Sequence, residues 1–304
     1  MNMKQFKYVM VLAEKGSFSR AADELNVSQP SLSQYVRRIE QDLGVILFDR
    51  AGGDVRLTDA GRVYINAGKT ILDTERQMHN QFSDLSSYKT GTLTVGIAPT
   101  RCQYLMPEIV KRFSEKYPGM HLVIEERFLG NLIEDAEHGA FDMCVATLPV
   151  DENKFEYELM MQEEVILAVP KVSAVNVSLQ NKQKQDEAHT FPVVDIRSID
   201  GADYVSLTET QPTQILMNGF CKEYELTVRT AVRCMSIETQ FSMVKAGIGL
   251  ALIPSSIAKY VDTDSVAFYS ITQETPDRKM AVIYRKGQYL SEAALTLKEI
   301  MTSV

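Results

Sequence analysis

Residues 17–44 constrain the fold most, because two helical patterns there are separated by only Asn26 and Val27. On both sides of this break apolar residues recur every three or four positions, which is typical of amphipathic helices. Asn tolerates the left-handed conformation that a tight turn needs, and Ser28 is suited to cap the following helix. A third amphipathic pattern covers residues 3–15. Two short helices joined by a tight turn and preceded by a supporting helix predict a helix-turn-helix.

The second helix of this motif has one apolar face and one polar face. The polar face carries Pro30, Ser33, Gln34 and Arg37. Hydroxyl, amide and guanidinium groups can bond base edges and phosphates in the major groove of DNA. Because any small helical bundle also has a polar face, the pattern alone leaves open a unit that serves only for dimerisation.

A short strand with a glycine turn follows the helices. Residues 55–57 read as a strand, and Gly52 with Gly53 indicates a tight turn before it, so we expect a two-stranded wing. Arg50 and Arg56 are candidates for phosphate contacts, which position a protein on DNA without reading its sequence. Two solvated surface arginines would fit the same pattern.

A long helix is predicted from residue 59 to about residue 87, with Thr58 and Asp59 as possible caps. About 30 residues span roughly 45 Å. A helix of this length with one apolar seam needs a partner, so we expect dimerisation through it; packing onto its own chain is the alternative. The seam consists of Val63, Ala67, Ile71, Met78, Phe82 and Leu85.

From residue 91 onward, strand-like and helical segments alternate, which predicts a parallel, doubly wound α/β sheet. A chain of 304 residues also exceeds the usual size of one domain. Residues 180–190 are polar and aperiodic, so we expect a surface loop there.

Charge and composition narrow the possible functions. The net charge is −8, but the first 90 residues are nearly neutral, so binding of nucleic acid at the front is permitted. Four scattered cysteines without a C-x-x-C motif, together with the lack of a signal-peptide layout or a membrane-length apolar run, suggest a cytoplasmic protein. The sequence has no catalytic motif of the hydrolase, zinc-protease or Walker type, and its four histidines lack metal-ligand spacing. We therefore expect no enzyme activity, cofactor or metal.

Polar residues at strand ends suggest a ligand site in the α/β part, because open sheets bind ligands beyond the carboxyl ends of strands and near helix N-termini. Arg101 could pair with a carboxylate, which predicts a small carboxylated metabolite as effector. Helix capping would explain each hydroxyl equally well, and a surface role would explain Arg101. The expected effector-binding residues are Thr100, Arg101, Thr147, Ser206 and Thr208.

Five motifs of the N-terminal region, in this order and spacing, resemble LysR-type transcriptional regulators: GSFSRAA, SQPSLS, IEQDLG, LFDR and RLTDAG. LTVGIA and MVKAGIGLALIP resemble the effector-binding half of that family. The resemblance implies an α + α/β protein with a winged helix-turn-helix, a long linker helix and a periplasmic-binding-protein-like α/β effector domain of two subdomains. The expected boundaries are 1–58, 59–89 and 90–304, with subdomain I at 90–163 and 269–304 and subdomain II at 164–268.

The resemblance also implies partners: double-stranded promoter DNA, a small-molecule effector, a homodimer or homotetramer, and RNA polymerase as a further contact, but no membrane. Many relatives have basic residues where this chain has Gln34 and Gly52-Gly53, so we expect a shallower salt dependence of DNA binding. The alternative is a small-molecule binding protein or enzyme that uses its N-terminal helices only to dimerise. The family's DNA-contacting positions fall on Ser28, Gln29, Pro30, Ser31, Ser33, Gln34 and Arg37, with Arg50 and Arg56 towards the wing.

Overall fold

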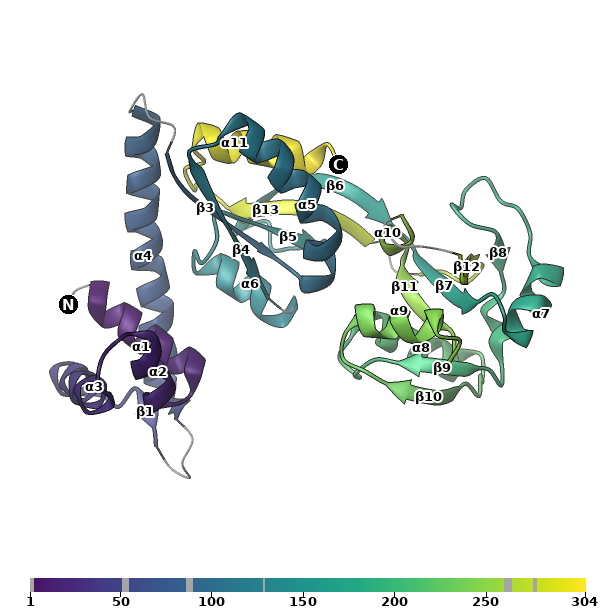
Figure 1. Cartoon of the computed structure of the whole chain (residues 1–304), viewed down its shortest axis with the longest axis horizontal. Coiled ribbons are helices and arrows are strands. Elements are labelled where there is room, and N and C mark those ends of the chain that lie inside the picture. Colours follow the sequence, from purple (N-terminus) through teal and green to yellow (C-terminus); the bar gives the residue numbers. More distant parts are fainter. Residues whose placement is uncertain (1–2, 51–54, 86–89, 128, 260–263, 276–277) are drawn as a thin grey trace.

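The computed structural model describes residues 3–50, 55–85, 90–127, 129–259, 264–275 and 278–304. Figure 1 shows a small helical domain at the N-terminus, one long upright helix, and an α/β region with two separate sheets. Within these ranges no helix combines the length and hydropathy that crossing a membrane requires.

The N-terminal helices form the predicted helix-turn-helix. Asn26 adopts a left-handed conformation with φ of 53° between the second and third helices. The Ser28 hydroxyl caps the third helix by accepting a hydrogen bond from the Ser31 backbone N–H at 3.3 Å. Apolar residues of all three helices pack into one buried cluster, which explains why such short helices are stable. The helices are α1 (Met3–Lys15), α2 (Phe18–Glu24) and α3 (Gln29–Leu43).

The predicted wing is present as an antiparallel pair of β1 (Phe48–Asp49) and β2 (Arg56–Leu57). The Glu40 carboxylate of α3 accepts hydrogen bonds from the backbone N–H groups of Leu47 and Phe48, at 2.9 and 3.2 Å, and so holds the wing against the helices. The expected turn at Gly52 and Gly53 lies outside the described residues.

The long helix α4 (Asp59–Leu85) begins at the predicted cap, where Thr58 Oγ1 accepts a hydrogen bond from the Gly61 N–H at 3.0 Å. One side of α4 contacts its own chain, as the alternative predicted. The side chains of Val63, Ile71, Met78 and Phe82 stay exposed along the seam, and dimerisation through it stays a prediction.

The first sheet of the α/β region has the order β4-β3-β5-β13-β6. Helices α5 and α11 share one buried cluster with this sheet, and α6 belongs to a second cluster on the other face. The strands are β3 (Gly91–Ile97), β4 (Met120–Glu126), β5 (Met143–Thr147), β6 (Phe155–Glu163) and β13 (Arg278–Arg285). The helices are α5 (Pro99–Lys116), α6 (Leu129–Glu137) and α11 (Glu292–Thr302).

The second sheet has the order β11-β7-β12-β8, and the parallel pair β9 and β10 lies beside it. Its strands are β7 (Val165–Pro170), β8 (Val193–Val194), β11 (Ala251–Pro254) and β12 (Val266–Ile271), with β9 (Asp203–Ser206) and β10 (Arg229–Arg233). Its helices are α7 (Ala174–Lys182), η2 (Ile196–Ile199), α8 (Pro212–Glu223), α9 (Ile237–Lys245) and α10 (Ser255–Ala258).

Three expectations need correction. The sheets are mixed rather than parallel, because β13 runs antiparallel to β5 and β6 while β7 runs antiparallel to β11 and β12. The chain crosses between the two sheets twice. It leaves the first sheet at the end of β6 and returns on β13, so β13 must run in the opposite direction to β6. β12 stays in the second sheet through Ile271, so the return lies after that residue rather than at residue 269. Helix α7 extends to Lys182, so the surface loop is shorter than predicted.

A buried charged contact joins α4 to the first sheet. Asp73 accepts hydrogen bonds at 2.6 Å from Arg76 and from Gln77, and it also pairs with Arg285 at the end of β13. Gly139 lies directly against it with φ of +80°, and a Cβ at Gly139 would lie 2.6 Å from the Asp73 side chain. The linker helix is therefore held to the effector half by a buried carboxylate and two partly buried arginines.

We predict that Asp73→Asn lowers the free energy of unfolding by about 3 kcal/mol, because it leaves Arg76 and Arg285 with less compensating charge in a buried site. Urea denaturation monitored by circular dichroism measures this loss. Asp59→Asn is the matched control: it removes the same charge from an exposed pair with Arg62 on the same helix and should change stability little. Equal losses in the two variants would contradict the buried contact.

Candidate functional site

Helix α3 presents its predicted polar face to solvent. The buried residues Leu32, Val36 and Ile39 fix the opposite face in the core of the small domain. In Figure 1, α3 lies at the end of the molecule away from both sheets. Ser33 is half-buried, whereas the other predicted residues of α3 and its cap are exposed: Ser28, Gln29, Pro30, Ser31, Gln34 and Arg37.

The serine hydroxyl groups at the N-terminus of α3 already form hydrogen bonds within the helix and its cap. The Ser28 hydroxyl receives the capping bond from Ser31, and the two hydroxyls are hydrogen-bonded to each other at 2.7 Å. Gln34 and Arg37 lie one turn and about two turns farther along the helix, and their exposed polar ends are available to an outside partner.

The two wing arginines differ in their surroundings. Arg50 donates a hydrogen bond to Glu40 at 3.1 Å and lies over the ring of Phe18, 4.9 Å from its centroid. It therefore ties the wing to α2 and α3. Arg56 is exposed on β2, opposite Asp49 in the strand register.

A cavity of about 380 Å³ lies between the two subdomains of the α/β region. The first turns of α5, α8 and α9 line it, together with the ends of β6 and β13 and part of α10. Helix N-termini carry unpaired N–H groups and a partial positive charge. Three of them facing one cavity favour an anionic group of a ligand.

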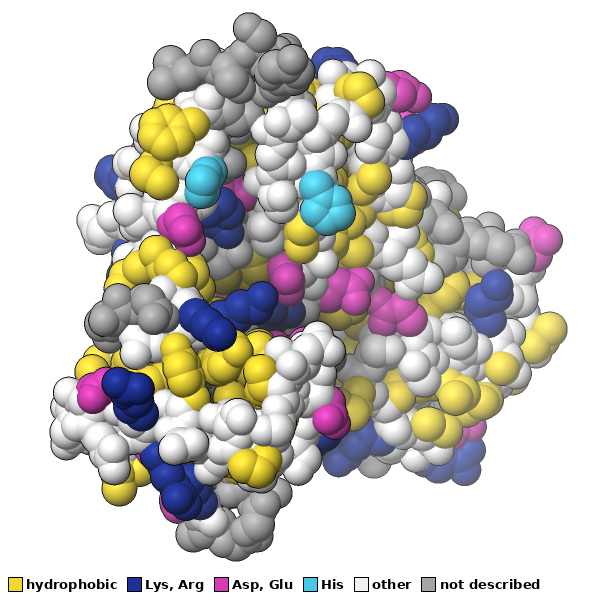
Figure 2. Space-filling model, turned by 60° about the vertical axis from the view of Figure 1, so that its left-hand side comes forward, with side chains coloured by type: hydrophobic (Ala, Val, Ile, Leu, Met, Phe, Trp, Pro, Cys, Tyr) yellow, Lys and Arg dark blue, Asp and Glu magenta, His cyan; other side chains and the backbone are white. Residues whose placement is uncertain are grey.

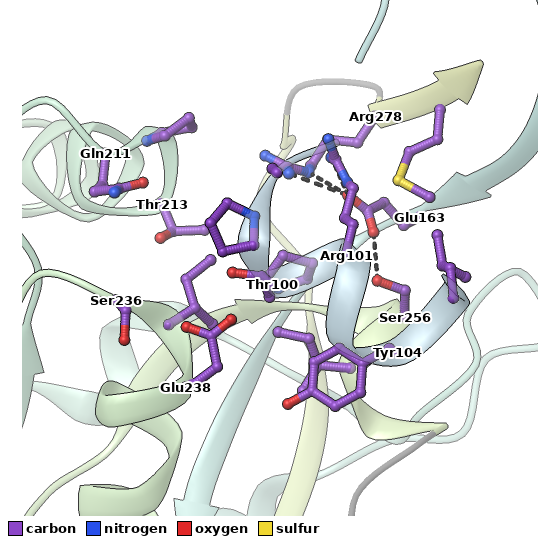
Figure 3. Close-up of a pocket in the computed structure, with 18 of the residues that line it drawn as sticks. Thr100, Arg101, Tyr104, Glu163, Gln211, Thr213, Ser236, Glu238, Ser256 and Arg278 are labelled. Atoms are coloured by element: carbon purple, nitrogen blue, oxygen red, sulfur yellow. Dashed lines mark hydrogen bonds and ion pairs between the residues drawn. The ribbon is translucent and has the colours of Figure 1, made fainter. Parts of the chain in front are cut away.

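A cluster of buried charges forms one wall of this cavity (Figure 3). Glu163 Oε1 lies 3.3 Å from Arg101 Nη2 and 3.0 Å from Arg278 Nη2, and Glu163 Oε2 accepts a hydrogen bond from Ser256 at 2.6 Å. Burial lowers the pKa of the Arg101 guanidinium, and the neighbouring Glu163 carboxylate opposes that shift. Two guanidinium groups share one carboxylate, so this wall can attract a further negative charge.

The structure brings together only part of the predicted effector residues. Thr100 and Arg101 line the cavity from the first turn of α5. Thr147 does not line the cavity but accepts a hydrogen bond from Arg101 at 2.8 Å. Ser206 is buried and hydrogen-bonded to Thr230 at 3.0 Å, and Thr208 is not part of the lining. The chain runs several residues beyond β9 before α8 begins, so the start of the helix, and not the end of the strand, reaches the cavity.

Several lining residues were missed by reasoning from the sequence. Ser236 is the N-cap of α9, and a cap pattern before a helix could have indicated it. Glu163 and Arg278 are 115 positions apart in the sequence, and no local signal predicts their contact. Ser256 and Glu238 lack such a signal as well.

Comparison with known proteins gives a consistent result over the whole chain. Residues 86–304 match the LysR substrate binding domain, and residues 3–62 match the bacterial regulatory helix-turn-helix protein of the lysR family. An uncharacterised HTH-type regulator, YcgK of Bacillus subtilis, is 28% identical and covers 99% of this chain and 94% of its own length. The dual regulator OxyR of Escherichia coli is 27% identical, over 95% of this chain and 91% of its own.

Solved structures show the same fold. A cysteine-to-aspartate variant of full-length OxyR from Pseudomonas aeruginosa superposes with a TM-score of 0.68 at 23% identity, covering 100% of this chain and 94% of that one. CbnR in complex with its target DNA has a TM-score of 0.63 at 19% identity, covering 100% and 99% of the two chains. The helix-turn-helix match covers the N-terminal domain, and the substrate-binding-domain match covers most of the remaining sequence. The chain therefore belongs to the LysR family of bacterial transcriptional regulators.

Proposed function

We propose that this regulator binds promoter DNA through the exposed face of α3, as a homo-oligomer, and that a small carboxylated molecule in the inter-subdomain cavity modulates this binding. The observation that carries the proposal is the joint presence of an exposed polar recognition face and a charged cavity in one chain, connected by α4. The match of residues 3–62 to the lysR-family helix-turn-helix favours this function over that of a binding protein that uses its N-terminal helices only to dimerise.

The proposed DNA contacts are those of the exposed polar face. Gln34 and Arg37 can reach base edges or phosphates, and Arg56 can contact phosphates from the wing. Arg50 pairs with Glu40 and stabilises the domain, so it contributes to DNA binding less directly. With few cations on this face, few counterions are released on binding, and the affinity should depend weakly on salt.

Exposed apolar residues on α4 support the proposed oligomer. Phe82 is 58% exposed and Val63 70% exposed, which is unfavourable for an isolated helix in water. Figure 2 shows hydrophobic side chains at the surface of this side of the molecule. A second copy of α4 packed along the seam would bury them.

The charge arrangement of the cavity supports a carboxylated effector. Arg101 and Arg278 share the charge of Glu163, and three helix N-termini face the same space. A carboxylate there would gain charge-assisted hydrogen bonds from guanidinium, backbone and hydroxyl groups. Its binding between two subdomains would bias their relative position, which a regulator needs.

Several relatives are named hydrogen peroxide-inducible genes activators, but the cysteines of this chain do not favour a reaction with peroxide. Here burial, with a smaller contribution from Glu126, raises the pKa of Cys102 to about 12, and burial also raises the pKa of Cys144, Cys221 and Cys234. Reactive thiols typically have a lowered pKa and an electropositive, partly exposed setting, so the raised pKa of these buried and half-buried cysteines does not favour peroxide chemistry.

We predict that Arg37→Ala weakens specific DNA binding by about 1–3 kcal/mol without changing thermal stability, because Arg37 is exposed on the polar face of α3 and away from the core. Genomic fragments selected on the purified protein provide the operator, and footprinting at near-physiological salt measures the affinity. Arg197→Ala, which removes one positive charge from the second subdomain, is the control. Unchanged affinity in Arg37→Ala would show that α3 does not lie on the DNA as proposed.

We predict that Phe82→Asp weakens self-association by about 2 kcal/mol or more, because it introduces a charge into the apolar seam. Sedimentation equilibrium measures the association constant. Val172→Asp introduces the same charge at an exposed valine of the second subdomain and should leave association unchanged. If Phe82→Asp associates as the wild type does, the interface lies elsewhere.

We predict that Thr100→Val weakens the effector response by about 1–2 kcal/mol while operator affinity without effector stays the same, because one hydroxyl hydrogen bond in the cavity is lost. DNA-binding titrations with and without a panel of small carboxylates measure both quantities. Thr302→Val at the end of α11, outside the cavity, is the matched control. Equal losses of response and operator affinity would assign Thr100 a structural role instead.

A further inference from the structure

The cavity has a second charged wall, formed by Glu238 in the first turn of α9. Figure 3 places the cluster of Arg101, Glu163 and Arg278 on one side of Thr100, and Glu238 with Ser236 on the other. The two walls belong to different subdomains. A molecule that fills the space between them meets arginine side chains at one end and an acidic side chain at the other.

The Glu238 carboxylate has an unmet hydrogen-bonding need. Its Oε1 atom is buried and has no hydrogen-bond partner among the described residues. Leaving a buried charged acceptor without a donor is costly, so such groups in native proteins call for an explanation. The N-terminus of α9 stabilises the charge on Glu238 but supplies no donor to Oε1 within the described part of the chain.

The Glu238 carboxylate also affects the pKa of a neighbouring side chain in the cavity. Tyr104, on α5, lines the same space, and its pKa is raised mainly by burial and also by the Glu238 carboxylate. Among the described residues, the charged side chains of the lining are Arg101, Arg278, Glu163 and Glu238. Their charges cancel, but they are distributed unevenly between the two walls.

We propose that the effector is an amino acid, whose carboxylate lies against Arg101, Arg278 and Thr100 and whose ammonium group pairs with the Glu238 carboxylate, where a positive charge offsets the cost of the unpaired, buried Oε1. This inference rests on the proposed function, which requires only a carboxylate, and it adds the amino group. A dicarboxylate without an amine would place negative charge near Glu238 and leave the charge of this carboxylate uncompensated. A zwitterion satisfies both walls and joins the two subdomains through opposite charges.

The remaining lining residues indicate the chemical character of the ligand's side chain. Leu105 and Met280 from the first subdomain, and Met235 and Ile237 from the second, contribute apolar side chains to the cavity. Such a lining favours hydrocarbon in the ligand, while the few polar groups fix its orientation. A small amino acid with an apolar side chain fits this combination.

The test uses the full-length protein and thermal shift followed by calorimetric titration. The probes are the common L-amino acids with several β- and ω-amino acids, each paired with the carboxylic acid in which hydrogen replaces the amino group. We expect at least one amino acid to bind, and its amine-free partner to bind about thirtyfold more weakly or worse, as when one member of a buried charge pair is removed.

Glu238→Gln distinguishes a ligand contact from a helix-stabilising role. This variant should lose the preference for the amino acid over its amine-free partner, whereas Glu292→Gln, which removes an acid from the first turn of α11 outside the cavity, should keep it. Binding of amine-free acids as tightly as amino acids overturns the inference but leaves the carboxylate proposal in place. If no amino acid binds, the inference is also wrong, and if no carboxylate binds either, the proposed effector class fails with it. A preference that survives Glu238→Gln removes Glu238 from the site.

Discussion

The effector half depends on the buried carboxylate of Glu163. It lies at the end of β6, where the chain leaves the first sheet, directly opposite Arg278, where the chain returns on β13. Arg101 on α5 and Ser256 on α10 complete its partners, so one side chain connects both crossing strands with a helix of each subdomain. Because a carboxylate with 4% exposure is stable only when it is paired, these four elements must meet here, and the cavity forms beside them.

The strand that returns from the cavity also reaches the linker helix. β13 begins with Arg278 in the cavity wall and ends with Arg285, whose guanidinium pairs with the buried Asp73 of α4. A strand of this length spans roughly 25 Å. Five positions before Asp73, α4 also packs closely against the N-terminal domain, since Gly68 lies directly against the ring of Phe6. The cavity, the linker helix α4 and the N-terminal domain are thus connected through β13 and α4.

The charge distribution explains how an acidic chain can still bind a polyanion. The excess of negative charge lies in the effector half, while the small N-terminal domain is nearly neutral. Several of its charged groups are used internally: Glu40 holds the wing and neutralises part of Arg50. On the proposed contacts, affinity would come from a few exposed groups such as Arg37 and Gln34, and less from a broad positive field.

The sequence by itself determined the helix-turn-helix, its wing, the start of α4 and the order of most α/β elements, because apolar periodicity, Asn26, Ser28 and Thr58 act within a few residues of each other. It also placed Thr100 and Arg101 at the cavity, since a helix start is a local feature. Only the tertiary structure decided the direction of β13, the pairing of Glu163 with Arg278, the burial of Asp73 and the place of Glu238. These contacts join segments far apart in the chain, and the free energy that selects them arises from burial and charge pairing that no local pattern records.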